Sequence, residues 1–338
     1  MPSIEQAITI AYEVTKRAPS ATFMFRGPPG SGKSMGALGV GDRHGLPKGR
    51  QLVVHINNHD VVDFTGVPSV VDGQTVFNPT EMFYKFREGT GPGLIVLEEI
   101  AQAPVSHQTW AAGFILERET ATFKLDPGVI IISTGNRAED KAGAKPLLTH
   151  LANRMYIMDI DTSVDDYSSW ALANQVDPMG VAFLRLRPGL LNDFNPNRQI
   201  NPTQRAWTQL FTEVPNSLPT DLYFQAAAAK VGEGPAAEWV AAKDMMAKMP
   251  SVDYILLQPA SAEIPTEPAV RFAVATSLAM RTTDESNFDR AMQYIERMPK
   301  EFQMLYVSDV VRQRPKVQQT GAFIKWALAN KDTFMNTK

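Results

Sequence analysis

The stretch Ala21–Ser34, which reads ATFMFRGPPGSGKS, decides the fold of this chain. Its first half, Ala21 to Phe25 closed by Arg26, is an apolar run typical of a buried strand. Its second half, Gly27–Ser34, fits the pattern G-x-x-x-x-G-K-[ST] at every fixed position. A strand that leads into such a loop, with a helix after it, has the local structure of a phosphate-binding loop. The alternative is a Gly/Pro-rich surface turn that matches the pattern by chance.

The residue types in this loop suit a bound phosphate. Its three glycines are expected to adopt positive φ, so that successive backbone N–H groups point inward at phosphate oxygens. We expect Lys33 to reach the β- and γ-phosphates and the Ser34 hydroxyl to ligate Mg²⁺. The residues predicted to hold the nucleotide are Gly27, Pro28, Pro29, Gly30, Ser31, Gly32, Lys33 and Ser34.

Length and composition narrow the class of protein. A chain of 338 residues is too long for one typical core and predicts two or three domains. A net charge of -3 argues against a general nucleic-acid binder, although it leaves a local basic groove open. The sequence has no cysteine, which excludes disulfides and cysteine zinc sites. The start MPSIEQAITI does not resemble a signal peptide, and no apolar run is long enough to span a bilayer, so we expect a soluble, cytoplasmic protein with no membrane partner.

The order of the predicted elements favours an α/β fold. A capping box at Ser3 and Gln6 predicts an N-terminal helix, and Asp72-Gly73 predicts a hairpin turn between two short strands, 67–71 and 75–77. Helices are also predicted at 34–40 and 80–87. Long connections separate the predicted strands, which favours a parallel doubly wound sheet. These strands are 21–25, 51–56, 93–100, 129–136 and 155–160.

Two carboxylates, Glu98 and Glu99, stand where the predicted strand 93–100 ends. In an open α/β sheet, ligands bind at the carboxyl ends of the strands, so both side chains should face the phosphate loop. We expect Glu98 to hold Mg²⁺, directly or through water, and Glu99 to accept a proton from an attacking water. The alternative is a strand that simply ends in solvated acidic residues.

Two further polar features follow predicted strands. Asn136 ends the strand 129–136, where an amide can hydrogen-bond both a terminal phosphate and the attacking water. His55 and His59 are four residues apart, a spacing that suits a metal pair on a helix. Because this segment is predicted as a strand followed by a loop, the two rings need not converge.

Beyond Asp161 the pattern changes to alanine-rich helical segments with proline boundaries. We therefore predict an α/β nucleotide-binding domain at 1–161, a helical lid at 162–230 and a helical C-terminal region at 231–338. Asn201 is predicted to cap a helix with Pro202 at its first position, so that Arg205 in the first turn can contact a bound phosphate. An isolated arginine is more often a solvated surface charge. Further helices are predicted at 223–230, 237–249, 268–280, 287–297 and 322–330.

Taken together, the motifs resemble those of the AAA+ ATPases, and in particular the MoxR-like branch. The resemblance covers Ile4 to about Val214. The segments that carry it are GPPGSGKS (27–34), LEEIAQAPVSHQ (97–108), ISTGN (132–136), ANRM (152–155) and NPTQRAW (201–207). The hairpin before Thr80 looks like the insertion in the second helix of that branch, and GEGPAAEW (232–239) is similar in style to phage-encoded relatives.

The resemblance implies an ATPase that uses ATP and Mg²⁺ in a homo-oligomeric ring, usually a hexamer, with ATP at the subunit interfaces. In that scheme Arg154 matches the arginine finger supplied to the neighbour, Arg137 is its rival, and Arg205 matches the second sensor. The sequence departs from the family at two points. Glu98 replaces an aspartate, and Arg154 lacks the usual Asp-Arg-Phe context.

The leading functional hypothesis is a ring that uses ATP hydrolysis to remodel or activate a protein client. A nucleic-acid translocase or packaging ATPase with the same core is the second hypothesis, and a scaffold ring that binds ATP without turnover is the third. An accessory ATPase for metal insertion is another possibility within the branch.

Overall fold

The computed structural model describes residues 1–137, 146–161 and 163–331. Two compact units make up the chain, Met1–Ser163 with Phe194–Arg198 and Val164–Asp193 with Gln199–Lys338. Residue 162, where the predicted lid begins, and residues 332–338, at the end of the predicted C-terminal region, lie outside the described residues. The second unit contains helices from both predicted helical parts. The division into three domains stays a prediction.

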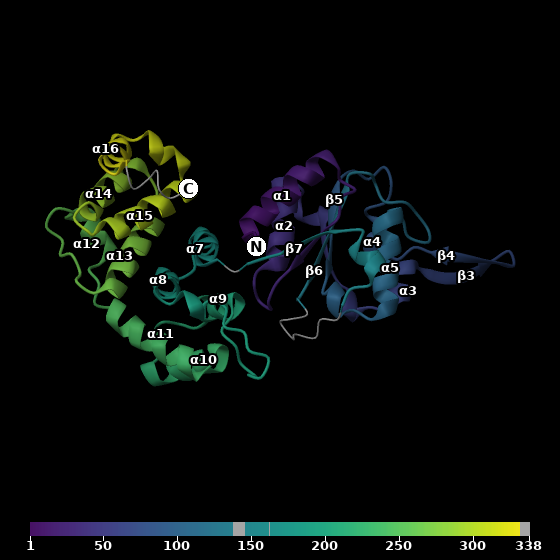
Figure 1. Cartoon of the computed structure of the whole chain (residues 1–338), viewed down its shortest axis with the longest axis horizontal. Helices are drawn as coiled ribbons and strands as arrows, with labels where there is room; N and C mark the ends of the chain where they lie inside the picture. Colours follow the sequence, from purple (N-terminus) through teal and green to yellow (C-terminus); the bar gives the residue numbers. More distant parts are fainter. Residues whose placement is uncertain (138–145, 162, 332–338) are drawn as a thin grey trace. The chain divides into compact units, whose positions relative to one another are not determined.

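The first unit is built on a five-stranded sheet in the order β2-β5-β6-β1-β7, with every neighbouring pair parallel (Figure 1). All five predicted strands are present, so the predicted parallel α/β sheet is confirmed. Both β5 and β6 are buried along their whole length, as parallel strands between two layers of helices must be. The strands are β1 (Phe23–Arg26), β2 (Gln51–His55), β5 (Gly93–Glu98), β6 (Val129–Gly135) and β7 (Tyr156–Asp159).

Helices cover both faces of this sheet. Side chains that alternate along β1 separate into two cores, since Phe25 packs in the core that contains α1 and α2, whereas Met24 packs in the core that contains α3 and α5. In Figure 1, α1 and α2 lie on one side of the strands and α3 to α5 on the other. The helices of this unit are α1 (Ile4–Arg17), α2 (Lys33–Arg43), α3 (Val61–Thr65), α4 (Glu81–Tyr84), α5 (Val105–Glu117) and α6 (Thr149–Ala152).

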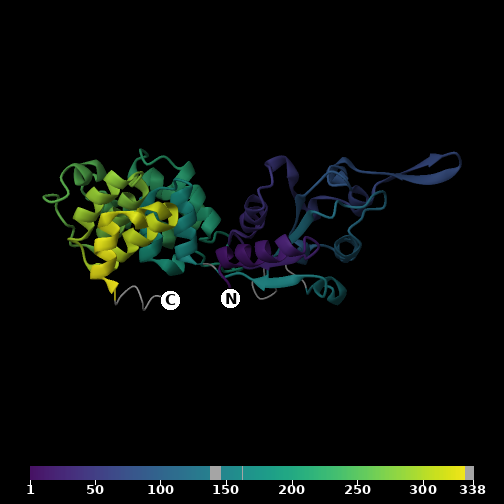
Figure 2. The ribbon, with the colours of Figure 1, turned by 90° about the horizontal axis from the view of Figure 1, so that it is seen from above.

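Local signals in the sequence fix several of these elements. The capping box at Ser3 and Gln6 is formed as predicted. The predicted helix 80–87 is shorter, because α4 ends at Tyr84. The predicted hairpin is present as β3 (Val67–Val71) and β4 (Gln74–Asn78), an antiparallel pair that turns at Asp72-Gly73 and projects away from the sheet (Figure 2).

The second unit is helical and has two hydrophobic cores. One core contains Trp207 and Trp239, and the other contains Tyr294 and Tyr306. Helix α13 contributes side chains to both, which ties the unit together. The helices are α7 (Val164–Ala173), α8 (Pro178–Leu186), α9 (Gln204–Glu213), α10 (Thr220–Val231), α11 (Glu233–Met246), α12 (Val252–Leu257), α13 (Pro268–Arg281), α14 (Glu285–Ile295), α15 (Lys300–Gln313) and α16 (Gly321–Ala329).

One predicted helix start in the second unit is wrong. The helix that carries Arg205 is capped by Thr203, whose hydroxyl accepts a hydrogen bond from the Ala206 amide, and not by Asn201. Thr203 is itself a good N-cap residue and stands directly before the first helical position, so it supplies the cap in place of Asn201. Arg205 nevertheless lies in the first turn of α9, as predicted.

Within the described part of the chain, the helices are all too short or too polar to cross a lipid bilayer.

Candidate functional site

The phosphate loop connects the end of β1 directly to the start of α2. Two of its glycines have positive φ, Gly30 at 73° and Gly32 at 82°. Gly32 is also the residue from which α2 begins, and no side chain among the described residues caps that helix. The first N–H groups of a helix have no partner within it, so this loop presents backbone donors where an anion would bind.

Gly27 differs from the prediction, because it does not adopt positive φ. Glycine is needed at position 27 for a steric reason. A Cβ atom at this position would lie 3.1 Å from the Ile160 carbonyl oxygen and 3.2 Å from the Ser31 hydroxyl. The loop therefore needs two of its glycines for backbone conformation and one for close packing against the end of β7.

Lys33 is folded over the loop that it ends. Its ammonium group donates hydrogen bonds to the carbonyl oxygens of Gly27, at 3.0 Å, and Pro28, at 2.7 Å. The residue is only 8% exposed. These two hydrogen bonds place the ammonium group of Lys33 against the loop, next to the site where phosphate oxygens would bind.

The end of strand β6 brings the three predicted motifs together. The Gly27 amide, which opens the phosphate loop, donates to the Gly135 carbonyl oxygen at 3.3 Å. The Glu99 amide, in the acidic pair, donates to the Thr134 hydroxyl at 3.4 Å. Asn136 follows Gly135 directly in the sequence. One strand end thus supports the loop, the acidic pair and the amide side chain.

The two acidic residues differ in environment. Glu98 is buried, with 6% of the residue exposed, whereas Glu99 is exposed. Glu99 also has φ of 60° and ψ of 32°, in the left-handed region that non-glycine residues rarely occupy. Such strain is concentrated at functional sites, where surrounding structure enforces it.

The two carboxylate oxygens of Glu98 have different surroundings. Its Oε2 lies 2.9 Å from Nδ1 of His55, which ends the neighbouring strand β2. Its Oε1 is buried and has no hydrogen-bond partner among the described residues. A buried carboxylate oxygen without a donor fits a cation, and oxygen ligands are those that Mg²⁺ prefers.

The surrounding residues suit Mg²⁺ better than a metal held by protein alone. The described residues contain no group of three or more His, Asp or Glu side chains that could hold a metal ion. Mg²⁺ usually takes only one or two carboxylates and completes its shell with water and substrate phosphates. The two histidines have different partners, since His59 lies 3.5 Å from Asp63 and His55 contacts Glu98.

The three candidate arginines occupy different surroundings. Arg154 is half-buried and donates to the Ala112 carbonyl oxygen on α5. Arg137 is half-buried and lies 3.5 Å from the Met1 sulfur. Arg205 is exposed on α9, which belongs to the second unit, whereas the phosphate loop belongs to the first. Their roles stay predictions.

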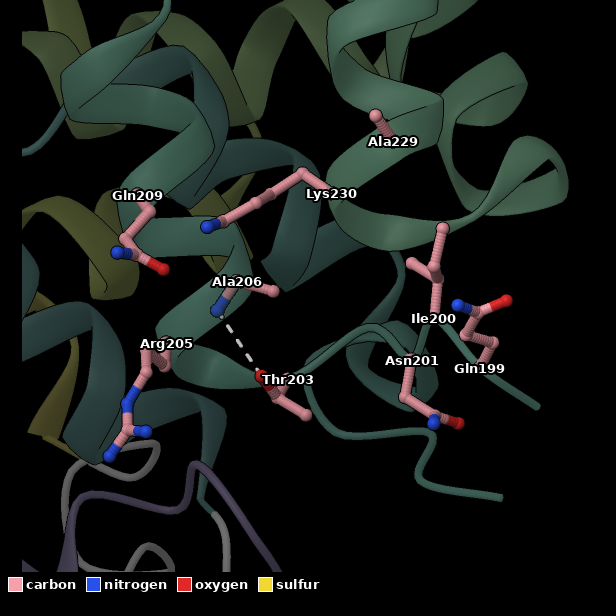
Figure 3. A pocket seen from close by; sticks show the side chains of 9 residues that line it. All are labelled: Gln199, Ile200, Asn201, Thr203, Arg205, Ala206, Gln209, Ala229 and Lys230. Carbon is pink, nitrogen blue, oxygen red and sulfur yellow. Dashed lines mark hydrogen bonds between the residues drawn. The ribbon is translucent and has the colours of Figure 1, made fainter. Parts of the chain in front are cut away.

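Arg205 lines a shallow pocket within the second unit, with a volume of about 290 Å³. Figure 3 shows that Lys230 extends toward Gln209, while the Arg205 guanidinium points away from both. Arg205 and Lys230 give the pocket two cationic side chains, and its other lining side chains are neutral.

The sequence interpretation missed two contacts at this site. The sequence pattern indicates His55 only as one half of a possible metal pair and indicates no role for Thr134. Both contacts depend on strand order, because His55 meets Glu98 only when β2 lies next to β5, and Thr134 meets Glu99 only when β6 lies next to β5. The polar residue at the end of an apolar strand was the available signal in each case.

The fold and the loop together define a P-loop α/β protein. No protein-family model matches the chain, and no curated protein matches it in sequence. Among solved structures, it is similar to NtrX from Brucella abortus, with a TM-score of 0.34 and 14% identity over 89% of this chain and 67% of that one. It is also similar to a DNA polymerase III gamma subunit-related protein from Thermotoga maritima, with a TM-score of 0.35 and 9% identity over 90% of this chain and 83% of that one.

Proposed function

We propose that this chain is an Mg²⁺-dependent ATPase of the AAA+ class. The observation that supports this function best is the end of β6, where hydrogen bonds from Gly27 and Glu99 bring the phosphate loop and the acidic pair beside Asn136. A loop of backbone donors alone would only bind an anion. A carboxylate and an amide at the same strand end add the groups that hydrolysis requires.

Different residues of the site would bind the phosphates, hold the metal and activate the attacking water. The loop amides and Lys33 bind the phosphates, and their positive charge stabilises the negative charge of the transition state. The Ser34 hydroxyl and Glu98 would hold Mg²⁺, which neutralises phosphate charge when bound. Glu99 accepts the proton of the attacking water, and the Asn136 amide orients that water.

The proposal extends to assembly and to a partner. We propose a homo-oligomeric ring, with six subunits as the expected number, in which Arg154 or its rival Arg137 completes the site of the neighbour. In this scheme Arg205 senses the γ-phosphate from the helical unit, so that the unit responds to ATP and ADP differently. The resemblance to the MoxR-like branch supports a cytoplasmic ring that remodels a protein client.

Two substitutions test the core of this proposal. Lys33→Ala removes the buried positive charge at the loop, so ATP binding should be lost. Glu99→Gln keeps the shape of the side chain but removes the base, so the variant should bind ATP while phosphate release falls by about 10²- to 10⁴-fold. Binding is measured with a fluorescent ATP analogue, and turnover by phosphate release.

Glu117→Gln is the matched control, because it makes the same change at an exposed position on α5. It should leave both measurements unchanged. Full turnover in Glu99→Gln would remove Glu99 from the mechanism. Stimulation of phosphate release by DNA that disappears as salt is raised would support the nucleic-acid translocase instead.

A further inference from the structure

His55 contacts the carboxylate proposed to hold Mg²⁺. The two residues are direct partners in the parallel pairing of β2 with β5, and His55 Nδ1 lies 2.9 Å from Glu98 Oε2. The two polar side chains are thus in direct contact across neighbouring strands. The imidazole side chain is 56% exposed, whereas the side chain of Glu98 is 8% exposed.

This contact makes the carboxylate asymmetric. Oε2 is bound by the imidazole, and Oε1 is buried without a partner among the described residues. Because Oε2 touches a side chain of the neighbouring strand, rotation of the carboxylate would break this contact. The contact therefore favours a single orientation, in which Oε1 is the oxygen available to a ligand.

The length of Glu98 makes such an anchor necessary. A glutamate has one more rotatable bond than an aspartate, and fixing each additional bond costs conformational entropy when a metal binds. Partners that orient a metal-binding carboxylate are typically worth 10- to 100-fold in metal affinity. At the end of β2, His55 is in position to supply this orientation before the metal arrives.

We propose that His55 is a positioning residue, which fixes the Glu98 carboxylate so that Oε1 is presented to the Mg²⁺ that accompanies the nucleotide. This inference rests on the proposed function, because it assumes that Glu98 serves the nucleotide-bound metal. In this proposal the contact with His55 offsets the extra rotatable bond that a glutamate has over an aspartate.

Metal affinity, measured separately from turnover, tests this role. The full chain with ADP is titrated with Mn²⁺ as a paramagnetic probe, and free Mn²⁺ is followed by electron paramagnetic resonance. His55→Ala should weaken Mn²⁺ binding about 10-fold. His55→Asn places an amide N–H near the position of Nδ1, so it should restore affinity to within about 3-fold of the parent. ADP affinity in EDTA should be the same in all variants.

His59→Ala is the matched control, since it removes a nearby imidazole whose ion-pair partner is Asp63 and not Glu98. It should leave Mn²⁺ affinity unchanged. A second comparison uses Glu98→Asp, which is one methylene too short to keep the contact. In that background, His55→Ala should change Mn²⁺ affinity less than 2-fold, because the two residues no longer interact.

The possible results distinguish a failure of the role of His55 from a failure of the proposed ATPase function. Parental Mn²⁺ affinity in His55→Ala, equal affinities in His55→Ala and His55→Asn, or a full effect of His55→Ala in the Glu98→Asp background would each overturn the role of His55. In all three cases, ADP binding by the parent chain would leave the proposed function standing. Failure of the parent chain to bind ADP or ATP would overturn the proposed function, and the inference with it.

Discussion

At the scale of single residues, Glu99 is where the site departs most from relaxed geometry. A left-handed conformation costs an L-residue about 1–2 kcal/mol. Two hydrogen bonds hold Glu99 there, since its amide donates to the Thr134 hydroxyl and its carbonyl oxygen accepts from the Asn57 side-chain amide at 3.5 Å. The residue before it, Glu98, is buried in β5. The backbone is therefore strained at the residue that we propose as the base.

This strain predicts an unusual order of stabilities. Glu99→Gly should be more stable than Glu99→Ala by about 1 kcal/mol, because glycine adopts the left-handed conformation without a Cβ clash. Both variants should lose ATP hydrolysis. Chemical denaturation, followed by circular dichroism, measures the difference in unfolding free energy.

Glu13, exposed within helix α1, provides the control. There the order should reverse, with Glu13→Gly less stable than Glu13→Ala by about 1 kcal/mol, because glycine is a poor helix former. The same order of stabilities at both positions would show that Glu99 is not strained in solution.

At the scale of elements, Asp126 joins the loops at the amino ends of β5 and β6, whereas the site lies at the carboxyl ends of these strands. Its carboxylate accepts from the amides of Gly128, at 2.9 Å, Gly91, at 2.8 Å, and Gly89, at 3.1 Å. The hydrogen bond from Gly128, followed by those from Gly91 and Gly89, lowers the pKa of Asp126 below its ordinary value. The loops before β5 and β6 are thereby held together.

A lowered pKa in the folded state means that the carboxylate stabilises the fold above its unfolded pKa and ceases to do so as the pH falls through its folded pKa. Asp126→Asn should therefore lower the free energy of unfolding by about 1 kcal/mol between pH 5 and 8. This value takes into account that solvent screens a partly exposed carboxylate. The difference from the parent should shrink below about pH 4. Urea denaturation at a series of pH values measures it.

Nucleotide affinity is the control in this case, because Asp126 lies before β6 and the site lies after it. It should be unchanged in Asp126→Asn. A loss of stability that persists undiminished at pH 3 would contradict the assignment to the ionised carboxylate.

At the scale of the whole molecule, the proposed ring requires a neighbouring subunit to complete each nucleotide site. Arg154 is held by the Ala112 carbonyl oxygen within its own subunit, so it must exchange that contact to reach another subunit. An arginine supplied in trans accelerates phosphoryl transfer by about 10³- to 10⁵-fold in related systems.

Mixing defective subunits tests this role. Arg154→Ala and Glu99→Gln should each be inactive alone, because one lacks the finger and the other lacks the base. In an equal mixture, about a quarter of the interfaces would combine an intact base with an intact finger, so phosphate release should recover. A mixture of Lys33→Ala and Glu99→Gln should not recover, because both defects lie in the same half of the site.

Arg137→Ala in place of Arg154→Ala distinguishes the two arginines. Recovery only with Arg137→Ala would assign the finger to Arg137. The absence of recovery with either variant, in a chain that hydrolyses ATP, would rule out both arginines as the group supplied by a neighbour.

Much of the fold could be predicted because its signals are local. The five parallel strands follow from apolar runs, the hairpin from Asp72-Gly73, and the N-terminal helix from the capping box. Errors arose where neighbouring residues compete for one role. Both Asn201 and Thr203 are good N-caps, and the choice between them depends on how the preceding segment approaches the helix.

The sequence by itself determined the phosphate loop, the buried strands and the acidic pair, because glycine conformation, hydrophobic burial and side-chain chemistry are properties of residues and their immediate neighbours. Only the tertiary structure decided that His55 binds Glu98, that Thr134 holds the Glu99 amide, and that Gly27 is required by packing against Ile160. The physical reason is strand order. A sheet joins residues far apart in the chain through pairing across strands, and local pattern does not encode which strands become neighbours.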